Sequence, residues 1–380
     1  MSESKYIKPG TSIRARLPAV DAMRGIVMVL MTLDHASHAF NAGRYAADSA
    51  IWYQPGAEIP AAQFLTRWAT HLCAPTFLFL AGFVLALSVA GRRARGDPER
   101  TIDGDIFKRG IFIMLLDPLW MSIGFGGNIT FQVLYAIGAG FCLMVLLRRL
   151  GMVKLLLISL GLFLFGEELA RLTLWPGDGQ KLGPIGILLI TGLQKVKVVF
   201  VLYPLLPWLA FMILGWVCGR YRLYKAAFNP VRFFAVAGAA SLSVFFIARG
   251  FNKYGNMLLY RYDNSILQWL HVSKYPPSLT FSALELGLMF VVLSLLFAWY
   301  RNRDASPANP LRVFGRTPLF FYVIHVHLLA AASWLLNMHQ AGGLRETYLA
   351  TMVALLVLYP LCRWYGHLKQ AHPKSLLRYL

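Results

Sequence analysis

The chain has 380 residues, of which 57% are hydrophobic and only 14% are charged, and its mean hydropathy is +0.55. Soluble domains carry about a quarter charged residues, so this composition excludes an ordinary soluble enzyme and indicates a polytopic membrane protein. A net charge of +20 is also found in proteins that bind nucleic acid. Because the cytoplasmic loops of membrane proteins collect Lys and Arg, that charge has a simpler source here, and we expect no nucleic-acid partner.

Apolar runs of about 20 residues are long enough to cross a bilayer as helices, and they recur along the whole chain. We therefore predict an all-α fold, a transmembrane helix bundle of about ten spans. It forms one domain over residues 20–363, with tails at 1–19 and 364–380. The predicted spans are residues 20–40, 64–90, 107–125, 130–147, 153–173, 198–218, 231–250, 280–300, 313–336 and 346–363.

Basic residues are distributed unevenly between the connections. If the N-terminus is cytoplasmic, the segments on that side hold 25 of the 37 Lys and Arg, and the opposite side holds eleven. This asymmetry predicts a multi-pass protein of the inner cell membrane with both termini in the cytoplasm. The first apolar run is too long and too charged for a signal peptide, so we expect no cleaved signal.

The first predicted span carries residues that a simple membrane anchor would not need. An ionised Arg24 or Asp34 near the centre of a spanning helix costs roughly 2.5–3.5 kcal/mol. Arg24 and His35 lie on one helical face, about 16 Å apart along the axis. This spacing suggests a polar pathway into the bilayer, with Arg24 as an anion clamp. Two local pairings compete with that interpretation: Arg24 with Asp21 (i, i+3) and Asp34 with His38 (i, i+4).

The second span begins with Arg67 and His71 one turn apart, ahead of a proline that frees backbone hydrogen-bonding groups beside His71. Imidazoles titrate near neutral pH, so His35 and His71 are the candidate proton-transfer groups. Glu167 and Glu168 are adjacent on one helix, so we expect only one of them to face the interior. Other polar residues of the later spans are Asp117, Glu285, Arg316, His325 and His327.

Three connections on the predicted outer side are long, at residues 41–63, 174–197 and 251–279. Their aromatic residues either form a belt at the membrane surface or stack on a substrate such as a sugar. The apolar run 185–194 is too short to span and predicts an interfacial or re-entrant segment. The four cysteines lie in four different spans without a CxxC pair, so we expect neither a disulfide framework nor a metal site.

Four segments resemble the signatures of a known superfamily. Residues 21–35 (DAMRGIVMVLMTLDH) resemble the first helix of transmembrane acyltransferases, where an Arg-Gly pair is followed by a His or another polar residue. Residues 70–82 (THLCAPTFLFLAG) resemble the second helix of the branch that includes the heparan-alpha-glucosaminide N-acetyltransferase catalytic domain. Residues 203–215 and 314–325 resemble later signatures of that branch. The resemblance covers about residues 14–365.

The resemblance implies transfer of an acetyl or other acyl group from cytoplasmic acyl-CoA to an acceptor on the far side of the membrane. The acceptor would be carbohydrate-like or another small molecule, membrane lipid would surround the protein, and the sequence leaves a homodimer open. In this scheme Arg24 and Arg316 bind the CoA phosphates, with Arg67 and His325 as further donor-binding residues. No metal is needed.

The catalytic base depends on a departure from the family pattern. The heparan-type enzymes carry their proposed active-site His in the first outer loop and have Asn at the position of His35, whereas residues 41–63 contain no His. The chemistry then rests on His35, as in the acyltransferase-3 branch, or on His71, with Asp34 orienting or charge-stabilising the histidine. A transporter or flippase is the rival function, because a polar intramembrane pathway also serves permeation.

Overall fold

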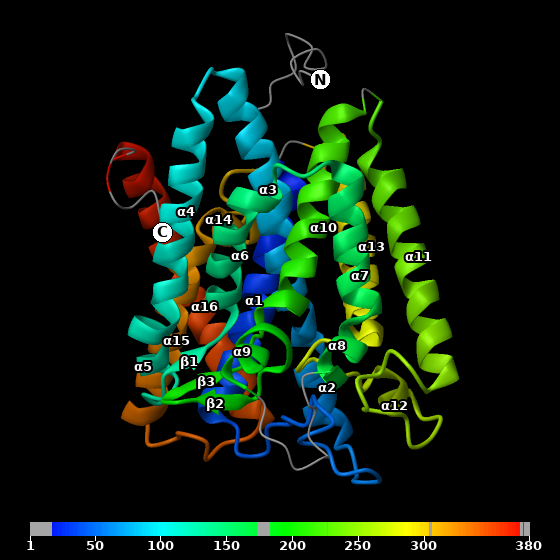
Figure 1. Cartoon of the computed structure of the whole chain (residues 1–380). Coiled ribbons are helices and arrows are strands. Elements are labelled where there is room, and N and C mark those ends of the chain that lie inside the picture. Colours follow the sequence, from blue (N-terminus) through cyan, green and yellow to red (C-terminus); the bar gives the residue numbers. More distant parts are fainter. Residues whose placement is uncertain (1–16, 173–182, 226, 304–305, 373–374, 376–380) are drawn as a thin grey trace.

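The computed structural model describes residues 17–172, 183–225, 227–303, 306–372 and 375. Helices dominate it, and most of the long ones run side by side as a bundle (Figure 1). The long helices are α1 (Pro18–Phe40), α3 (Cys73–Ala94), α4 (Glu99–Leu116), α6 (Val133–Leu147), α7 (Met152–Leu164), α10 (Leu205–Tyr224), α11 (Pro230–Phe251), α13 (Leu279–Trp299), α15 (Pro318–Leu335) and α16 (Leu344–Ala371). The short helical segments are α2 (Ala61–Ala69), η2 (Thr70–Leu72), η3 (Asp117–Met121), α5 (Ser122–Gly124), α8 (Gly166–Leu172), α9 (Pro184–Gly186), η4 (Ile187–Thr191), α12 (Ile266–Leu270) and α14 (Pro310–Arg316).

Within the described residues, five helices are long and apolar enough to cross a membrane. They are α11, α13, α15, α16 and the continuous helical stretch Ala61–Ala94. Helix α1 is equally long, but its polar residues reduce its apolar character. The predicted helical membrane architecture is confirmed at this level, whereas the count of ten spans and the cytoplasmic termini stay predictions.

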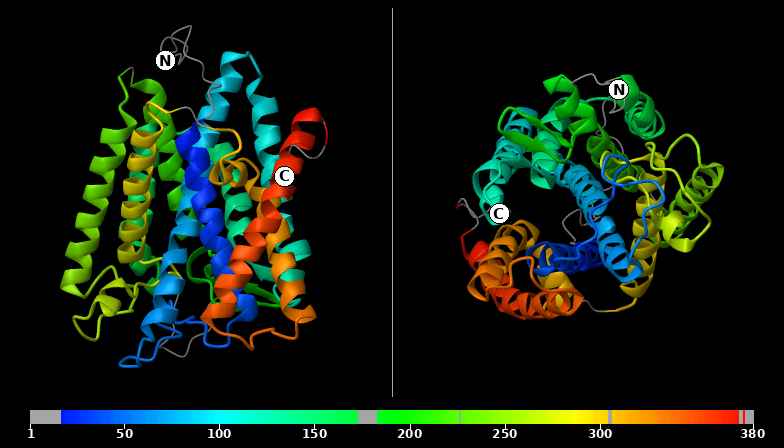
Figure 2. Two further views of the ribbon diagram at one scale, coloured as in Figure 1. Left: turned by 180° about the vertical axis from the view of Figure 1, so that it is seen from behind. Right: turned by 90° about the horizontal axis from the view of Figure 1, so that it is seen from below.

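The two ends of the bundle differ in structure. Helix α1 begins and α16 ends toward one end (Figures 1 and 2), and α16 continues past the predicted limit at 363 to Ala371. The opposite end carries a small sheet with the strand order β1-β3-β2. Strand β3 runs parallel to β1, with Thr130 opposite Phe200, and antiparallel to β2. The strands are β1 (Thr130–Phe131), β2 (Gln194–Val196) and β3 (Val199–Val201).

The predicted span 198–218 is wrong at its start. Residues Val199–Val201 form the central strand β3, and helix α10 begins only at Leu205, after Pro204 at its N-cap. A short apolar run rich in valine fits a strand as well as a helix, and periodicity alone does not distinguish them. The apolar run at 185–194, which was predicted to be too short to span, lies mostly in the short segments α9 and η4 at the end of the bundle that carries the sheet.

Two pairs of glycines let helices approach at backbone contact. A Cβ atom on Gly25 of α1 would lie 1.9 Å from the carbonyl oxygen of Leu311 in α14, and one on Gly315 would lie 1.8 Å from that of Asp21. A Cβ atom on Gly82 of α3 would similarly lie 1.9 Å from the Met212 oxygen of α10, and one on Gly215 of α10 would lie 1.9 Å from the Phe79 oxygen of α3. Any side chain would therefore force these helices apart, which gives the glycines of the resembling segments a structural role.

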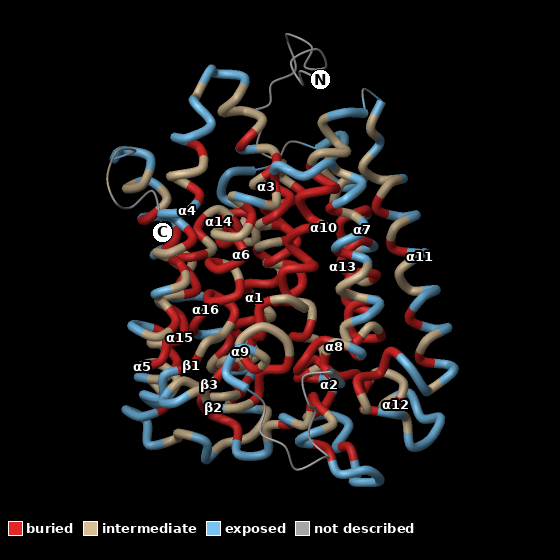
Figure 3. Tube along the Cα trace, in the orientation of Figure 1, coloured by how far each residue is buried: buried red, intermediate tan, exposed pale blue. Residues whose placement is uncertain are grey.

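Burial is greatest in the middle of the bundle. Figure 3 shows α1, α3 and α10 mostly buried and α11 mostly exposed at the edge. Buried Asp117, in the short π-helical segment η3, accepts hydrogen bonds from the backbone N–H groups of Gln132 and Tyr135 at 2.9 and 2.6 Å. It thereby caps the start of α6. The central position of α1 turns its polar residues inward, where they line two cavities.

Candidate functional site

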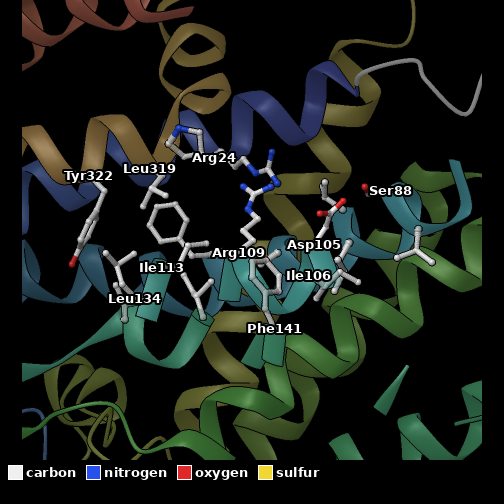
Figure 4. Close-up of a pocket in the computed structure, with 18 of the residues that line it drawn as sticks. Arg24, Ser88, Asp105, Ile106, Arg109, Ile113, Leu134, Phe141, Leu319 and Tyr322 are labelled. Atoms are coloured by element: carbon white, nitrogen blue, oxygen red, sulfur yellow. The ribbon is translucent and has the colours of Figure 1, made fainter. Parts of the chain in front are cut away.

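The first cavity, of about 360 Å³, lies between α1, α3, α4, α6 and α15. In Figure 4 the guanidinium groups of Arg24 and Arg109 point toward one another, while Leu134 and Leu319 lie on the side that leads to Tyr322. Two converging guanidinium groups repel each other and favour a bound anion. We call this space the arginine cavity, after its polar residues Arg24, Ser88, Arg92, Asp105 and Arg109.

The second cavity, of about 430 Å³, lies toward the end of the bundle that carries the sheet. We call it the histidine cavity because His35 and His38 line it. Phe77, Val133 and Tyr322 line both cavities, so the two spaces are neighbours with these three side chains at their common boundary. The charged residues of the histidine cavity are Asp34, Arg44, Arg67, Lys195 and Lys274.

His35 forms a hydrogen-bonded pair with a histidine from a distant part of the chain. Its Nδ1 lies 2.7 Å from Nε2 of His325, and Nδ1 of the fully buried His325 lies 3.0 Å from the Phe321 carbonyl oxygen. A carbonyl only accepts hydrogen bonds, so we assign the His325 proton to Nδ1, which leaves its Nε2 as an acceptor. Nδ1 of His35 then donates, and its Nε2 keeps a free lone pair. A general base requires this tautomer.

Beside the histidine pair, two carboxylates share one arginine. Asp34 contacts Arg44 at 3.0 Å and Arg67 at 2.5 Å, and Arg67 also contacts Asp48 at 2.7 Å. Asp48 lies in the connection after α1. Burial alone would raise the pKa of its carboxyl, but the neighbouring charges of Arg67 and His71 hold that pKa below its usual value. Asp34 is therefore bound by two arginines, and not by His38 as the local i, i+4 spacing had suggested.

The structure separates the other predicted site residues. His71 is fully buried with Nε2 3.3 Å from Asp48, and it does not line either cavity. Arg67 lies in the histidine cavity between two carboxylates, away from the arginine cavity. Nε of Arg316 lies 3.6 Å from Asp21, and Arg316 is not part of either lining. Of the residues predicted to bind the donor, Arg24 alone lines the arginine cavity.

Several lining residues, among them Arg92, Arg109, Tyr322 and Lys274, were not singled out from the sequence. Arg92 and Arg109 belong to a basic cluster that was interpreted from the sequence as part of an ordinary cytoplasmic connection. Tyr322 lies one turn before His325, and this i, i+3 spacing could have placed both residues on the same helix face from the sequence alone. Lys274 lies in an aromatic connection and has no local signal.

The family described as "Heparan-alpha-glucosaminide N-acetyltransferase, catalytic" matches residues 16–249, which is more than half of the chain. The chain belongs to this family. The resemblance seen in the sequence is confirmed, and with the apolar helices it identifies an integral membrane protein of an acetyltransferase family. No curated protein matches the chain. His325 and Lys274 lie beyond the matched residues, so any role for them rests on the geometry above.

Proposed function

We propose that this protein transfers an acetyl group from acetyl-CoA, held in the arginine cavity, to an acceptor held in the histidine cavity. The observation that carries the proposal is that the two cavities are neighbours, with Phe77, Val133 and Tyr322 in both linings. A donor with its phosphates at Arg24 directs its thioester along α1 toward His35. The transfer runs from the cytoplasm across the inner membrane.

The chemistry of the arginine cavity suits CoA, which has phosphates at one end and a thioester at the end of a long arm. A guanidinium group binds phosphate through two parallel hydrogen bonds. Arg24 and Arg109 converge there, and Arg92 lines the same space. The apolar remainder of the cavity suits the arm. Arg92 and Arg109 replace Arg316 in this proposal, because Arg316 lies beside Asp21.

We assign the general base to His35. Its Nε2 takes a proton from the acceptor hydroxyl or amine as that oxygen or nitrogen bonds to the thioester carbonyl carbon. The intermediate then breaks its C–S bond, the electron pair leaves on the CoA sulfur, and the imidazolium returns the proton to that sulfur. His325 holds the base in its tautomer. Asp34 and His71 act as positioning residues through the carboxylate–arginine network.

The donor site is tested by titrating the purified full chain in detergent with CoA. A charge-assisted hydrogen bond contributes about 1.5–3 kcal/mol, so Arg24→Ala should weaken CoA binding about 10- to 150-fold. Arg95→Ala is the matched control, because Arg95 pairs with Asp97 at 3.7 Å and does not line the cavity. Equal CoA affinity in both variants would remove Arg24 from the donor site.

The acceptor chemistry is tested by release of the CoA thiol in the presence of glucosamine, chosen because the family name contains a glucosaminide. His35→Ala should abolish thiol release and retain CoA binding. His372→Ala, which changes an exposed histidine at the far end of α16, should leave both unchanged. A transporter would show no thiol release in the wild type, so the same assay separates the two functions.

A further inference from the structure

Tyr322 of α15 lies at the common boundary of the two cavities, and the base assignment gives it no role. Phe77 and Val133, which line both cavities with it, have hydrocarbon side chains. Among the described residues, Tyr322 is therefore the one side chain in both linings that carries a hydrogen-bond donor. The residue is only 4% exposed, and Figure 4 shows it at the end of the arginine cavity away from Asp105.

The ring of Tyr322 packs against the histidine pair. Its centroid lies 6.0 Å from that of His35 and 5.6 Å from that of His325, and both contacts are edge-to-face. Tyr322 and His325 are also one turn apart on α15, so the helix holds them on one face. The phenol is thus positioned beside the proposed base by two independent contacts.

The hydroxyl of Tyr322 makes no hydrogen bond to any residue that the structure describes. Buried tyrosine hydroxyls normally have a partner. Other donors that line the histidine cavity have one: the hydroxyl oxygens of Tyr203 and Tyr275 lie 3.4 Å apart, and Thr70 and Cys73 donate to backbone carbonyl groups. The Tyr322 hydroxyl is therefore available to a ligand at the boundary of the two cavities.

The proposed transfer needs a hydrogen-bond donor at this boundary. The donor molecule is bound in the arginine cavity and is attacked from the histidine cavity, so its thioester has to lie between them. When a lone pair of the acceptor bonds to the carbonyl carbon, the π pair of the C=O bond moves to the oxygen, which becomes an oxyanion. A fixed donor directed at that oxygen stabilises the transition state. A phenol, which keeps its proton at neutral pH, suits this role.

We propose that Tyr322 is a catalytic residue whose hydroxyl donates a hydrogen bond to the thioester carbonyl oxygen and stabilises the oxyanion. This inference rests on the proposed function, because it places the acetyl group at the boundary of the two cavities. Tyr322 keeps its proton throughout. The acceptor proton goes to Nε2 of His35, the oxyanion pair forms the C=O bond again as the C–S bond breaks, and the sulfur takes the proton from the imidazolium.

The kinetic test is Tyr322→Phe, which keeps the ring and removes only the hydroxyl. Loss of one oxyanion donor lowers kcat about 10²–10³-fold, so thiol release from acetyl-CoA with glucosamine should slow by that factor. The KM for acetyl-CoA should change little, because the interaction is strongest in the transition state. CoA, which has no acetyl carbonyl, should bind both proteins alike.

Tyr365→Phe is the matched control for removing a buried phenol hydroxyl. Tyr365 belongs to the neighbouring helix α16, its ring stacks on that of Phe320 of α15 with the centroids 4.1 Å apart, and it lines neither cavity. This variant should release thiol at the wild-type rate. An equal loss of rate in Tyr365→Phe and Tyr322→Phe would overturn the proposal, because the effect would then come from packing.

Infrared spectroscopy of bound acetyl-CoA with an isotope-labelled carbonyl tests the contact without turnover, in the absence of acceptor. The carbonyl stretch should lie at a lower frequency in the wild type than in Tyr322→Phe. Equal frequencies would overturn the proposal even if the rate falls, because the hydroxyl would then act on another atom such as the sulfur. If Tyr322→Phe does not fold, Tyr322→3-fluorotyrosine, whose phenol is a stronger donor, must lower the frequency further, or the proposal fails.

The two measurements separate this proposal from the proposed function. Thiol release by the wild type, together with an undiminished rate in Tyr322→Phe, would keep the acetyltransferase function and reject the role of Tyr322. A frequency difference between the two proteins, with no thiol release by the wild type, would reject acetyl transfer and with it catalysis by Tyr322, and would keep only the carbonyl contact.

Discussion

Replacing His325 tests whether the histidine pair sets the tautomer of the base. His325→Leu removes the acceptor that lies 2.7 Å from Nδ1 of His35, leaving that N–H unsatisfied inside the protein. An unsatisfied buried donor costs about 1–3 kcal/mol, and each 1.36 kcal/mol of barrier is a factor of ten, so kcat should fall about 5- to 150-fold. The KM for acetyl-CoA should stay the same, because His325 does not line the arginine cavity.

Two further variants, His325→Gln and His35→Ala, are compared with His325→Leu. His325→Gln places an amide oxygen near the position of Nε2, so it should recover much of the rate that His325→Leu loses. His35→Ala removes the base itself, for which losses of about 10²–10⁴ are typical, so it should be the slowest of the three. The assay is thiol release from acetyl-CoA with glucosamine. Equal rates for the Leu and Gln variants, or a wild-type rate for Leu, would refute the positioning role.

Three further predictions follow from packing, protonation and topology. Gly25→Ala should lower the melting temperature, because its Cβ atom would lie 1.9 Å from a backbone oxygen. Gly104→Ala in α4 is the control: its Cβ atom would have nothing within 4 Å, so this variant should be more stable than the wild type by about 0.5–1 kcal/mol. Similar melting temperatures for the two variants would count against the α1–α14 contact. Burial lowers the pKa of His271, so the unfolded chain binds a proton at this residue more readily than the folded chain does. The free energy of unfolding should therefore decline below about pH 6.5, and it should decline less in His271→Gln. An equal decline in the wild type and the variant would exclude His271 as the cause. Cysteines at Arg95 and Glu58 should react with impermeant reagents from the cytoplasm and from outside, respectively, and the reverse pattern would overturn the predicted topology.

Features that follow from the local periodicity of the sequence were predicted well. The predicted span 20–40 corresponds to α1, and 64–90 lies within the helical stretch Ala61–Ala94. Glu167 is buried and Glu168 is exposed, as expected for neighbours on one helix. These features depend on local periodicity, and a single sequence contains that information.

The site was harder to predict because its contacts join distant segments. Nothing near His35 marks His325, 290 residues away, as its hydrogen-bond partner. The bonds of Asp34 to Arg44 and Arg67 likewise override the i, i+4 pairing with His38 that local spacing favoured. Local patterns show which polar residues enter the membrane, and only the fold decides which of them meet.

The arrangement of charge explains why the polar residues of α1 are tolerated. Asp34 would be costly alone, but Arg44 and Arg67 bind it, and the second carboxylate, Asp48, balances Arg67 from the other side. This network comes close to neutrality without any ligand. The arginine cavity differs, because the guanidinium groups of Arg24, Arg92 and Arg109 line it together with one carboxylate, Asp105. That grouping of guanidinium groups beside an apolar space is the reason why we propose that the phosphates of the donor bind there.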